Sequence, residues 1–253
     1  MNFLDLRTVF FTNIITFTIC TLVVALLWRQ SRNRFAGMSL LVFDFAMQAT
    51  ATFLIAMRGV ITDWLSISLA NILVLAGSIL GYMGLERFVG KVSSQIHNYI
   101  LLGIYAFVFN YFAFIQTDLA LRTLIISLCL FIIWFQCMWL MLYRVGPGMR
   151  PLTLEVGLIF GAFCLINFVR IAEFFMGPHP VNDYFHSGVF QTLVIIGYQT
   201  LMILLTFSLV LMVNKRLFGD LKAQEEKFSK AFHSSPYAVT LPRLDYGQII
   251  EVN

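Results

Sequence analysis

The chain has 253 residues, of which 59% are hydrophobic and only 12% are charged. Soluble proteins carry about a quarter charged residues, so this composition excludes an ordinary soluble domain and predicts an integral membrane protein. The net charge of +4 comes from cations scattered between apolar segments, and without a single basic patch no nucleic-acid partner is expected. The lipid bilayer is the partner that the composition predicts.

Seven apolar segments follow one another along the chain. They comprise residues 8–28, 36–57, 64–84, 98–116, 119–143, 152–176 and 188–213. At about 1.5 Å per residue, each is long enough to cross a hydrocarbon core of about 30 Å. We therefore expect an all-α membrane protein in which residues 1–213 form a seven-transmembrane helix bundle. The pairs Gly77-x3-Gly81 and Gly157-x3-Gly161 predict faces on which two helices approach closely.

Lysine and arginine are shared unequally between alternate loops. Ten of them lie in the loops after the first, third and fifth segments or within ten residues of the end of the seventh: Arg29, Arg32, Arg34, Arg87, Lys91, Arg144, Arg150, Lys215, Arg216 and Lys222. The other set of loops has only Arg7, Arg58 and Arg122. Cytoplasmic loops carry the excess of basic residues in membrane proteins. We expect the N-terminus outside and the C-terminus in the cytoplasm.

A group of polar side chains falls near the middle of the bilayer when depth is counted from the segment ends. It consists of Asp44, Gln48, Asn71, Asn110, Gln136, Asn167 and Gln199. An acidic residue inside a membrane is costly and is by default a functional hypothesis, so Asp44 could form the floor of a ligand pocket or respond to protons. Alternatively, all these groups hydrogen-bond neighbouring helices together. The sequence is compatible with both interpretations.

Two further groups could bind a ligand or an ion. Arg170 and Glu173 are three residues apart in the sixth segment, so they either pair along one helix face or leave Arg170 to anchor an anionic ligand. His179, Asp183 and His186 gather in the loop after that segment and are weak metal or pH-sensing candidates. Their spacing matches no strong zinc pattern, and a plain loop is the competing interpretation.

The lack of lysine and histidine at certain positions argues against two common membrane cofactors. The seventh segment has no lysine for a retinal Schiff base, and no segment interior contains the histidines of a transmembrane haem. All four cysteines lie in apolar segments without a CxxC pair, so we expect core residues and no metal site. We find no catalytic motif in these residues, and any enzyme activity would belong to a longer protein.

Residues 214–231 are charged in both signs but keep a helical seam. Leu217, Leu221, Gln224, Phe228 and Ala231 recur at a 4-3-4-3 spacing. This spacing predicts a signalling helix that can pair in a homodimer. A solvated helix that pairs with nothing is the alternative.

The last residues carry a family resemblance. Phe228-x3-Phe232-His-Ser-Ser-Pro precedes two β-rich runs, 238–241 and 248–252, which flank the turn Asp245-Tyr246-Gly247. This stretch resembles the start of a PAS domain, and Gly84-Leu-Glu-Arg-Phe-Val-Gly resembles a junction in the multi-pass sensory domains of bacterial histidine kinases and diguanylate cyclases. The resemblance implies that residues 232–253 begin a PAS domain whose remainder and output module lie beyond residue 253.

These observations lead to one expected function and two alternatives. We expect a sensory domain of a two-component histidine kinase in the bacterial inner membrane, which detects an unknown small ligand or membrane stimulus. The signal would pass through Leu217, Leu221, Phe228 and Phe232 to the cytoplasmic PAS domain. A diguanylate cyclase is the alternative output, and a transporter or channel is the alternative of another class, although no internal repeat supports it.

Overall fold

The structure is a computed structural model that describes residues 6–31, 34–176, 188–233, 240–242 and 249–252. The chain divides into two compact units, residues 1–210 and residues 211–253.

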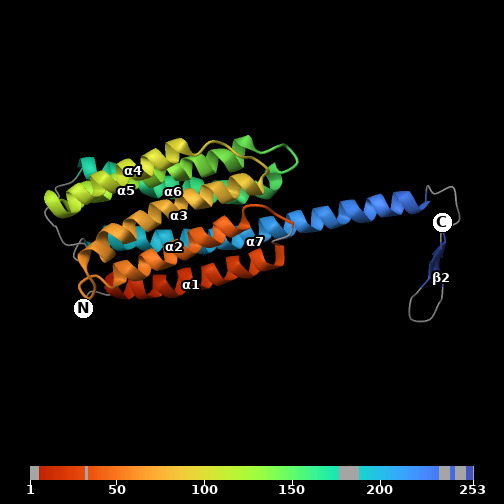
Figure 1. Cartoon of the computed structure of the whole chain (residues 1–253), viewed down its shortest axis with the longest axis horizontal. Coiled ribbons are helices and arrows are strands. Elements are labelled where there is room, and N and C mark those ends of the chain that lie inside the picture. Colours follow the sequence, from red (N-terminus) through yellow and green to blue (C-terminus); the bar gives the residue numbers. More distant parts are fainter. Residues whose placement is uncertain (1–5, 32–33, 177–187, 234–239, 243–248, 253) are drawn as a thin grey trace. The chain divides into compact units, whose positions relative to one another are not determined.

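Helices make up nearly all of the first unit (Figure 1). They are α1 (Leu6–Ser31), α2 (Met38–Ala56), α3 (Ala70–Phe88), α4 (Ile96–Asn110), α5 (Leu119–Trp139), α6 (Arg150–Met176) and α7 (Gly188–His233), of which α7 continues into the second unit. Short π-helical stretches adjoin three of them, η1 (Trp64–Leu69), η2 (Tyr111–Ile115) and η3 (Leu140–Arg144). Within the described residues, seven helices are long and apolar enough to cross a membrane, which confirms the predicted spans and indicates a membrane protein.

Local sequence explains where some helices begin. Gly37 adopts a left-handed conformation, with φ of +86°, at the start of α2. A side chain there would also overlap the backbone of Gly84 on α3, so glycine permits both the turn and the close approach. Asp118 begins α5 because its Oδ1 accepts a hydrogen bond from the backbone N–H of Leu121 at 3.0 Å.

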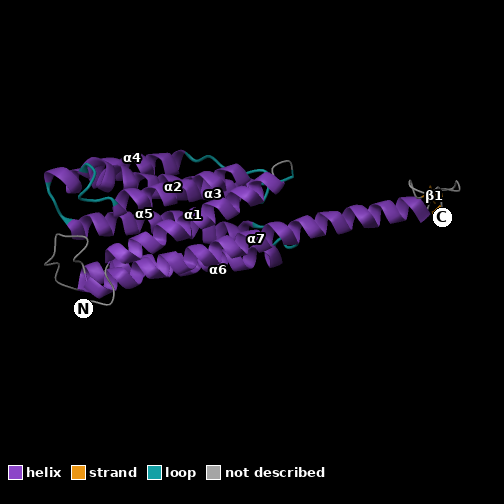
Figure 2. Ribbon diagram, turned by 90° about the horizontal axis from the view of Figure 1, so that it is seen from below, coloured by secondary structure: helices purple, strands orange, loops and turns teal. Residues whose placement is uncertain are grey.

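The helices pack side by side and consecutive helices run in opposite directions (Figures 1 and 2). α2 packs between α1 and α3, and α5 contacts α3, α4 and α6. The glycine pairs predicted from the sequence lie at such contacts: a Cβ at Gly77 or Gly81 would meet Asp44 on α2, and one at Gly157 would overlap Leu142. Both small-residue faces are thus confirmed as contact surfaces.

Glu86 connects the end of α3 to later segments through hydrogen bonds and a salt bridge. Its buried carboxylate accepts hydrogen bonds from Ser93 Oγ at 2.5 Å and from Gln95 Nε2 at 2.8 Å. Arg144 at the end of η3 contributes the salt bridge, with Nη1 at 3.7 Å from Glu86 Oε1. A buried carboxylate is tolerated when it is paired and hydrogen-bonded in this way. We refer to these four residues as the Glu86 network.

The second unit contains the rest of α7 and two short strands. The predicted connector, residues 214–231, is not a separate helix but lies within α7, which has no break between Gly188 and His233. Along the predicted seam Leu221 and Phe228 are exposed, and the Phe228 ring stacks on Phe232 with centroids 6.1 Å apart. In the unit itself, these two exposed side chains form an apolar face.

Strand β1 (Thr240–Pro242) pairs with β2 (Ile249–Val252) in antiparallel fashion, with Thr240 opposite Val252. The predicted runs, 238–241 and 248–252, overlap these strands with shifts of one or two residues at their ends. The predicted turn at residues 245–247 lies outside the described residues.

Candidate functional site

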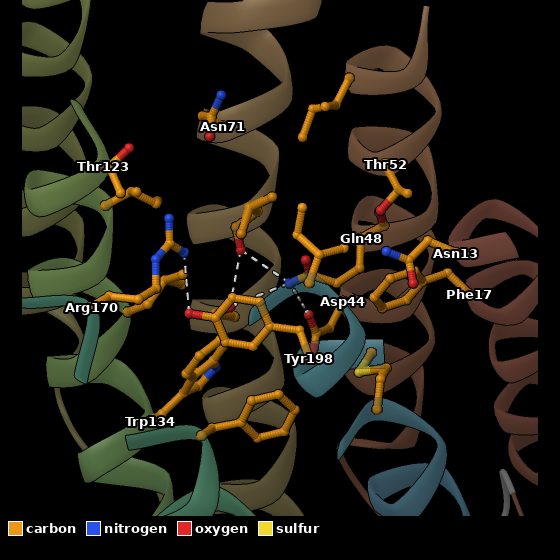
Figure 3. Close-up of a pocket in the computed structure, with 18 of the residues that line it drawn as sticks. Asn13, Phe17, Asp44, Gln48, Thr52, Asn71, Thr123, Trp134, Arg170 and Tyr198 are labelled. Carbon is orange, nitrogen blue, oxygen red and sulfur yellow. Dashed lines mark hydrogen bonds between the residues drawn. The ribbon is translucent and has the colours of Figure 1, made fainter. Parts of the chain in front are cut away.

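A cavity of about 180 Å³ lies inside the first unit and is lined by side chains from all seven helices (Figure 3). Most of its wall is apolar, with a limited set of charged and amide groups, which is the usual composition of a small-molecule site. The polar groups differ from one end of the cavity to the other.

Three arginines, Arg58, Arg122 and Arg170, line the cavity toward one end of the bundle. Here α2 and α6 finish and α5 begins, and we call it the arginine end. Arg58 Nη2 donates to the backbone oxygen of Ser66 at 3.3 Å, and Arg122 Nε donates to that of Asp118 at 3.3 Å. Arg58 and Arg122 thus bring two like charges to the same part of the lining.

Arg170 reaches toward the middle of the cavity. Only 7% of the residue is exposed, its Nη1 donates to Tyr198 Oη at 3.3 Å, and its guanidinium carbon lies 5.8 Å from the centroid of the Tyr198 ring. Figure 3 shows this pair side by side. Tyr198 Oη in turn donates to Asn167 Oδ1 at 3.0 Å, so Tyr198 on α7 bonds both Arg170 and Asn167 of α6.

Aromatic rings form one wall below the arginines. The Trp134 ring lies 4.5 Å from Phe163 and 5.7 Å from Tyr198 between centroids, and Phe163 lies 6.2 Å from Tyr198. These spacings are typical of mutually attractive aromatic pairs. Helices α5, α6 and α7 each contribute one ring, so the wall offers a rigid apolar surface to a ligand.

Asp44 and Gln48 lie on α2 on the other side of the cavity (Figure 3). Gln48 Nε2 is 3.1 Å from Asp44 Oδ1, 3.1 Å from the backbone oxygen of Val74 and 3.3 Å from Ser78 Oγ. These contacts fix the amide between α2 and α3. Asp44 is 14 residues from Arg58, about 21 Å along a helix, so this acid and that base do not pair.

Asn13 on α1 adds a polar side chain whose oxygen accepts no hydrogen bond from the described residues. Its side chain lines the cavity and is only 3% exposed. Among the described residues, Asn13 Oδ1 has no hydrogen-bond partner. A buried amide that lacks a partner is costly, and such groups in native structures call for a specific explanation.

The polar layer predicted from the sequence is divided by the fold. Asp44, Gln48 and Asn71 line the cavity, as does Arg170, which was predicted separately from this layer. Four others bridge helices: Asn110 accepts from Ser68 at 2.5 Å, Gln136 donates to Asn98 at 3.1 Å, Asn167 accepts from Tyr198, and Gln199 donates to Thr16 at 2.7 Å. For these four, the structure has the interhelical contacts of the second interpretation.

Glu173 takes no part in the cavity. It is exposed on α6, and no salt bridge joins it to Arg170 among the described residues, so the pair along one helix face, the first of the two interpretations, does not form there. His179, Asp183 and His186 lie outside the described residues. The four cysteines are buried and unbridged, in line with their expected place in the core.

The sequence analysis did not single out many residues of this site, among them Asn13, Arg58, Arg122, Trp134 and Tyr198. Arg58 and Arg122 entered only the count of loop cations. A usable signal was that both adjoin apolar segments at the same end as Arg170. No comparable signal distinguishes Trp134 or Tyr198 from other aromatic residues of the segments.

The described lining residues supply cations, amides and aromatic faces, which suit binding and orientation of a small molecule. We find among them no nucleophile held by a neighbouring base, the arrangement that covalent catalysis requires. In comparisons with protein-family models, curated proteins and solved structures, the chain shows no match.

Proposed function

We propose that residues 1–210 are the sensory domain of a bacterial sensor histidine kinase and that α7 carries the signal to a cytoplasmic PAS domain. The observation that carries this proposal is the course of α7. Gln191 and Tyr198 line the cavity, and the same helix continues without a break to His233. A ligand that moves the first half of a continuous helix also moves the second, because its hydrogen bonds make the helix stiff.

The PAS assignment is supported by sequence order and by the strand pair. A helix ending in the motif around Phe232 precedes two antiparallel strands, β1 and β2, as the resemblance implies. The same resemblance leaves diguanylate cyclase as the alternative output. The distribution of lysine and arginine supports a cytoplasmic location for the PAS domain, with the helices of residues 1–210 in the inner membrane.

The exposed apolar face of α7 supports a homodimer. Leu221 is 43% exposed and Phe228 58%, and both belong to the heptad-like seam. In a dimer, Leu221→Cys should form a disulfide between two chains in membranes, whereas Ala223→Cys, two residues along the helix, should not. Equal cross-linking of the two variants would exclude a pairing through this face.

Output from the intact protein tests the sensory role of the cavity. Asp44→Asn retains a hydrogen-bonding amide near Gln48 but removes the charge, so we expect the protein to fold and its stimulus response to change. Asp63→Asn, on an exposed residue outside the cavity, is the matched control and should leave the response unaltered. The readout is autophosphorylation, or cyclic-dinucleotide synthesis for the alternative output.

A response that is the same in both variants would remove the support for sensing through this cavity. Solute uptake by proteoliposomes that contain the protein would instead favour the transporter or channel. These two measurements separate the classes, because a sensor needs no net flux across the bilayer.

A further inference from the structure

We propose that the cavity binds a small organic carboxylate with a body about the size of one aromatic ring, whose carboxylate lies among Arg58, Arg122 and Arg170. As the stimulus of a sensor, this ligand rests on the proposed function, but its binding can be tested without it. Four features of the described cavity support the proposal.

The charge of the lining favours an anion. Three arginines and one acid, Asp44, are the charged residues among the described lining side chains. Arg58 and Arg122 line the same cavity, where like charges repel, and a negative group between them would replace that repulsion with attraction. Guanidinium groups bind carboxylates with two parallel hydrogen bonds, which makes arginine well suited to this ligand.

The size of the cavity limits the body of the ligand. A dry cavity of about 150 Å³ in another protein accommodates benzene, so about 180 Å³ accommodates one ring and little more. Two acyl chains of a phospholipid are far larger, which favours a free small molecule over a lipid headgroup. A ligand of this size also fits within a site enclosed by seven helices.

The wall below Arg170 favours an aromatic or branched apolar body. Trp134, Phe163 and Tyr198 present ring faces to one region, and Arg170 lies directly beside Tyr198. A ligand whose ring packs on this wall would have its carboxylate within reach of the guanidinium. Offset or edge contacts between rings are attractive beyond what burial alone provides.

Asn13 supplies an independent indication of a ligand. Its side chain is 3% exposed and lines the cavity, and its Oδ1 lacks a partner among the described residues. An amide can both donate and accept, so it can bind an oxygen or a donor of a molecule in the cavity. A bound ligand would thereby remove the cost of an unsatisfied buried group.

Binding can be measured with the 253-residue chain in lipid nanodiscs, because Trp134 reports on the cavity. Benzoate and phenylacetate serve as probes, benzamide and phenylacetamide as neutral molecules of matched shape, and inorganic phosphate as a bare anion. We expect saturable tryptophan quenching and a higher unfolding temperature with both acids. The amides and phosphate should bind at least tenfold more weakly.

Single substitutions test the arginines. Arg58→Gln and Arg122→Gln should each weaken benzoate binding about tenfold or more, the usual effect of losing a charged hydrogen bond. Arg122→Lys, which keeps the charge but not the planar fork, should fall between Gln and the native residue. Arg150→Gln, on an exposed residue that does not line the cavity, is the matched control and should bind normally.

Three results would overturn the proposal: no saturable binding of either acid, equal binding of acids and amides, or equal binding of phosphate and acids. If neither acid binds but Asp44→Asn alters output, the carboxylate proposal fails and the sensory function stands. If the acids bind and neither they nor Asp44→Asn change output, the sensory function fails and the binding site stands.

Discussion

Gly81 illustrates how a single atom can determine the contact between α2 and α3. A Cβ at this position would overlap the carboxylate of Asp44, which also contacts Gln48. We therefore expect Gly81→Ala to destabilise the protein by about 1–3 kcal/mol, the usual range for overpacking of a well-packed interior. The measurement is thermal unfolding in detergent.

Gly103→Ala on α4 is the control for this substitution, because nothing lies within 4 Å of a Cβ there. It should leave stability unchanged or raise it by up to about 1 kcal/mol, since alanine favours a helix more than glycine does. Equal losses in the two variants would show that the contact with Asp44 has no special role.

The Glu86 network offers a second test at the same scale. Glu86→Gln would keep the shape but replace a carboxylate that accepts from Ser93 and Gln95 and pairs with Arg144. We expect a loss of about 1–3 kcal/mol in the free energy of unfolding. Glu173→Gln, on an exposed residue of α6, should change stability by less than about 0.5 kcal/mol. A network that contributes nothing would give equal unfolding temperatures.

At the scale of elements, α7 is the helix for which rotational phase should matter. A paired seam repeats every seven residues, so inserting seven residues near Gln224 should largely preserve signalling in the intact protein. Inserting three or four should rotate Phe228 and Phe232 out of register and lock or reverse the output. Autophosphorylation or cyclic-dinucleotide synthesis measures the difference.

The competing element is a flexible tether, whose reach changes little with length. With a tether, insertions of three, four and seven residues would all be tolerated. Such indifference would discard the signalling helix while leaving the seven membrane spans untouched, because those depend on length and hydrophobicity alone.

At the scale of the whole molecule, the orientation of the protein in the membrane is the property to be tested. Ten basic residues on one set of loops against three on the other predict a cytoplasmic location for the loop at Arg150. A reporter fused after Arg150 should therefore be cytoplasmic, and one fused within residues 182–186 should be external. The opposite pair of results would reverse the orientation and with it the side from which the arginine end is reached.

The sequence by itself determined the seven membrane helices, because hydrophobicity over a fixed length requires no knowledge of neighbours. It also identified the glycine faces, since these follow from local residue types. It could place Asp44, Gln48 and Gln136 at similar depths, but depth leaves the direction around the helix axis open.

Tertiary structure decided that direction. In the folded protein Gln48 lines the cavity, whereas Gln136 donates a hydrogen bond to Asn98. Arg58 and Arg122 come from the ends of different helices and line the cavity together with Arg170. These contacts join residues far apart in the chain, and they depend on which helix packs against which. A single sequence carries little signal about such pairings, so the site appeared only when the seven helices were assembled.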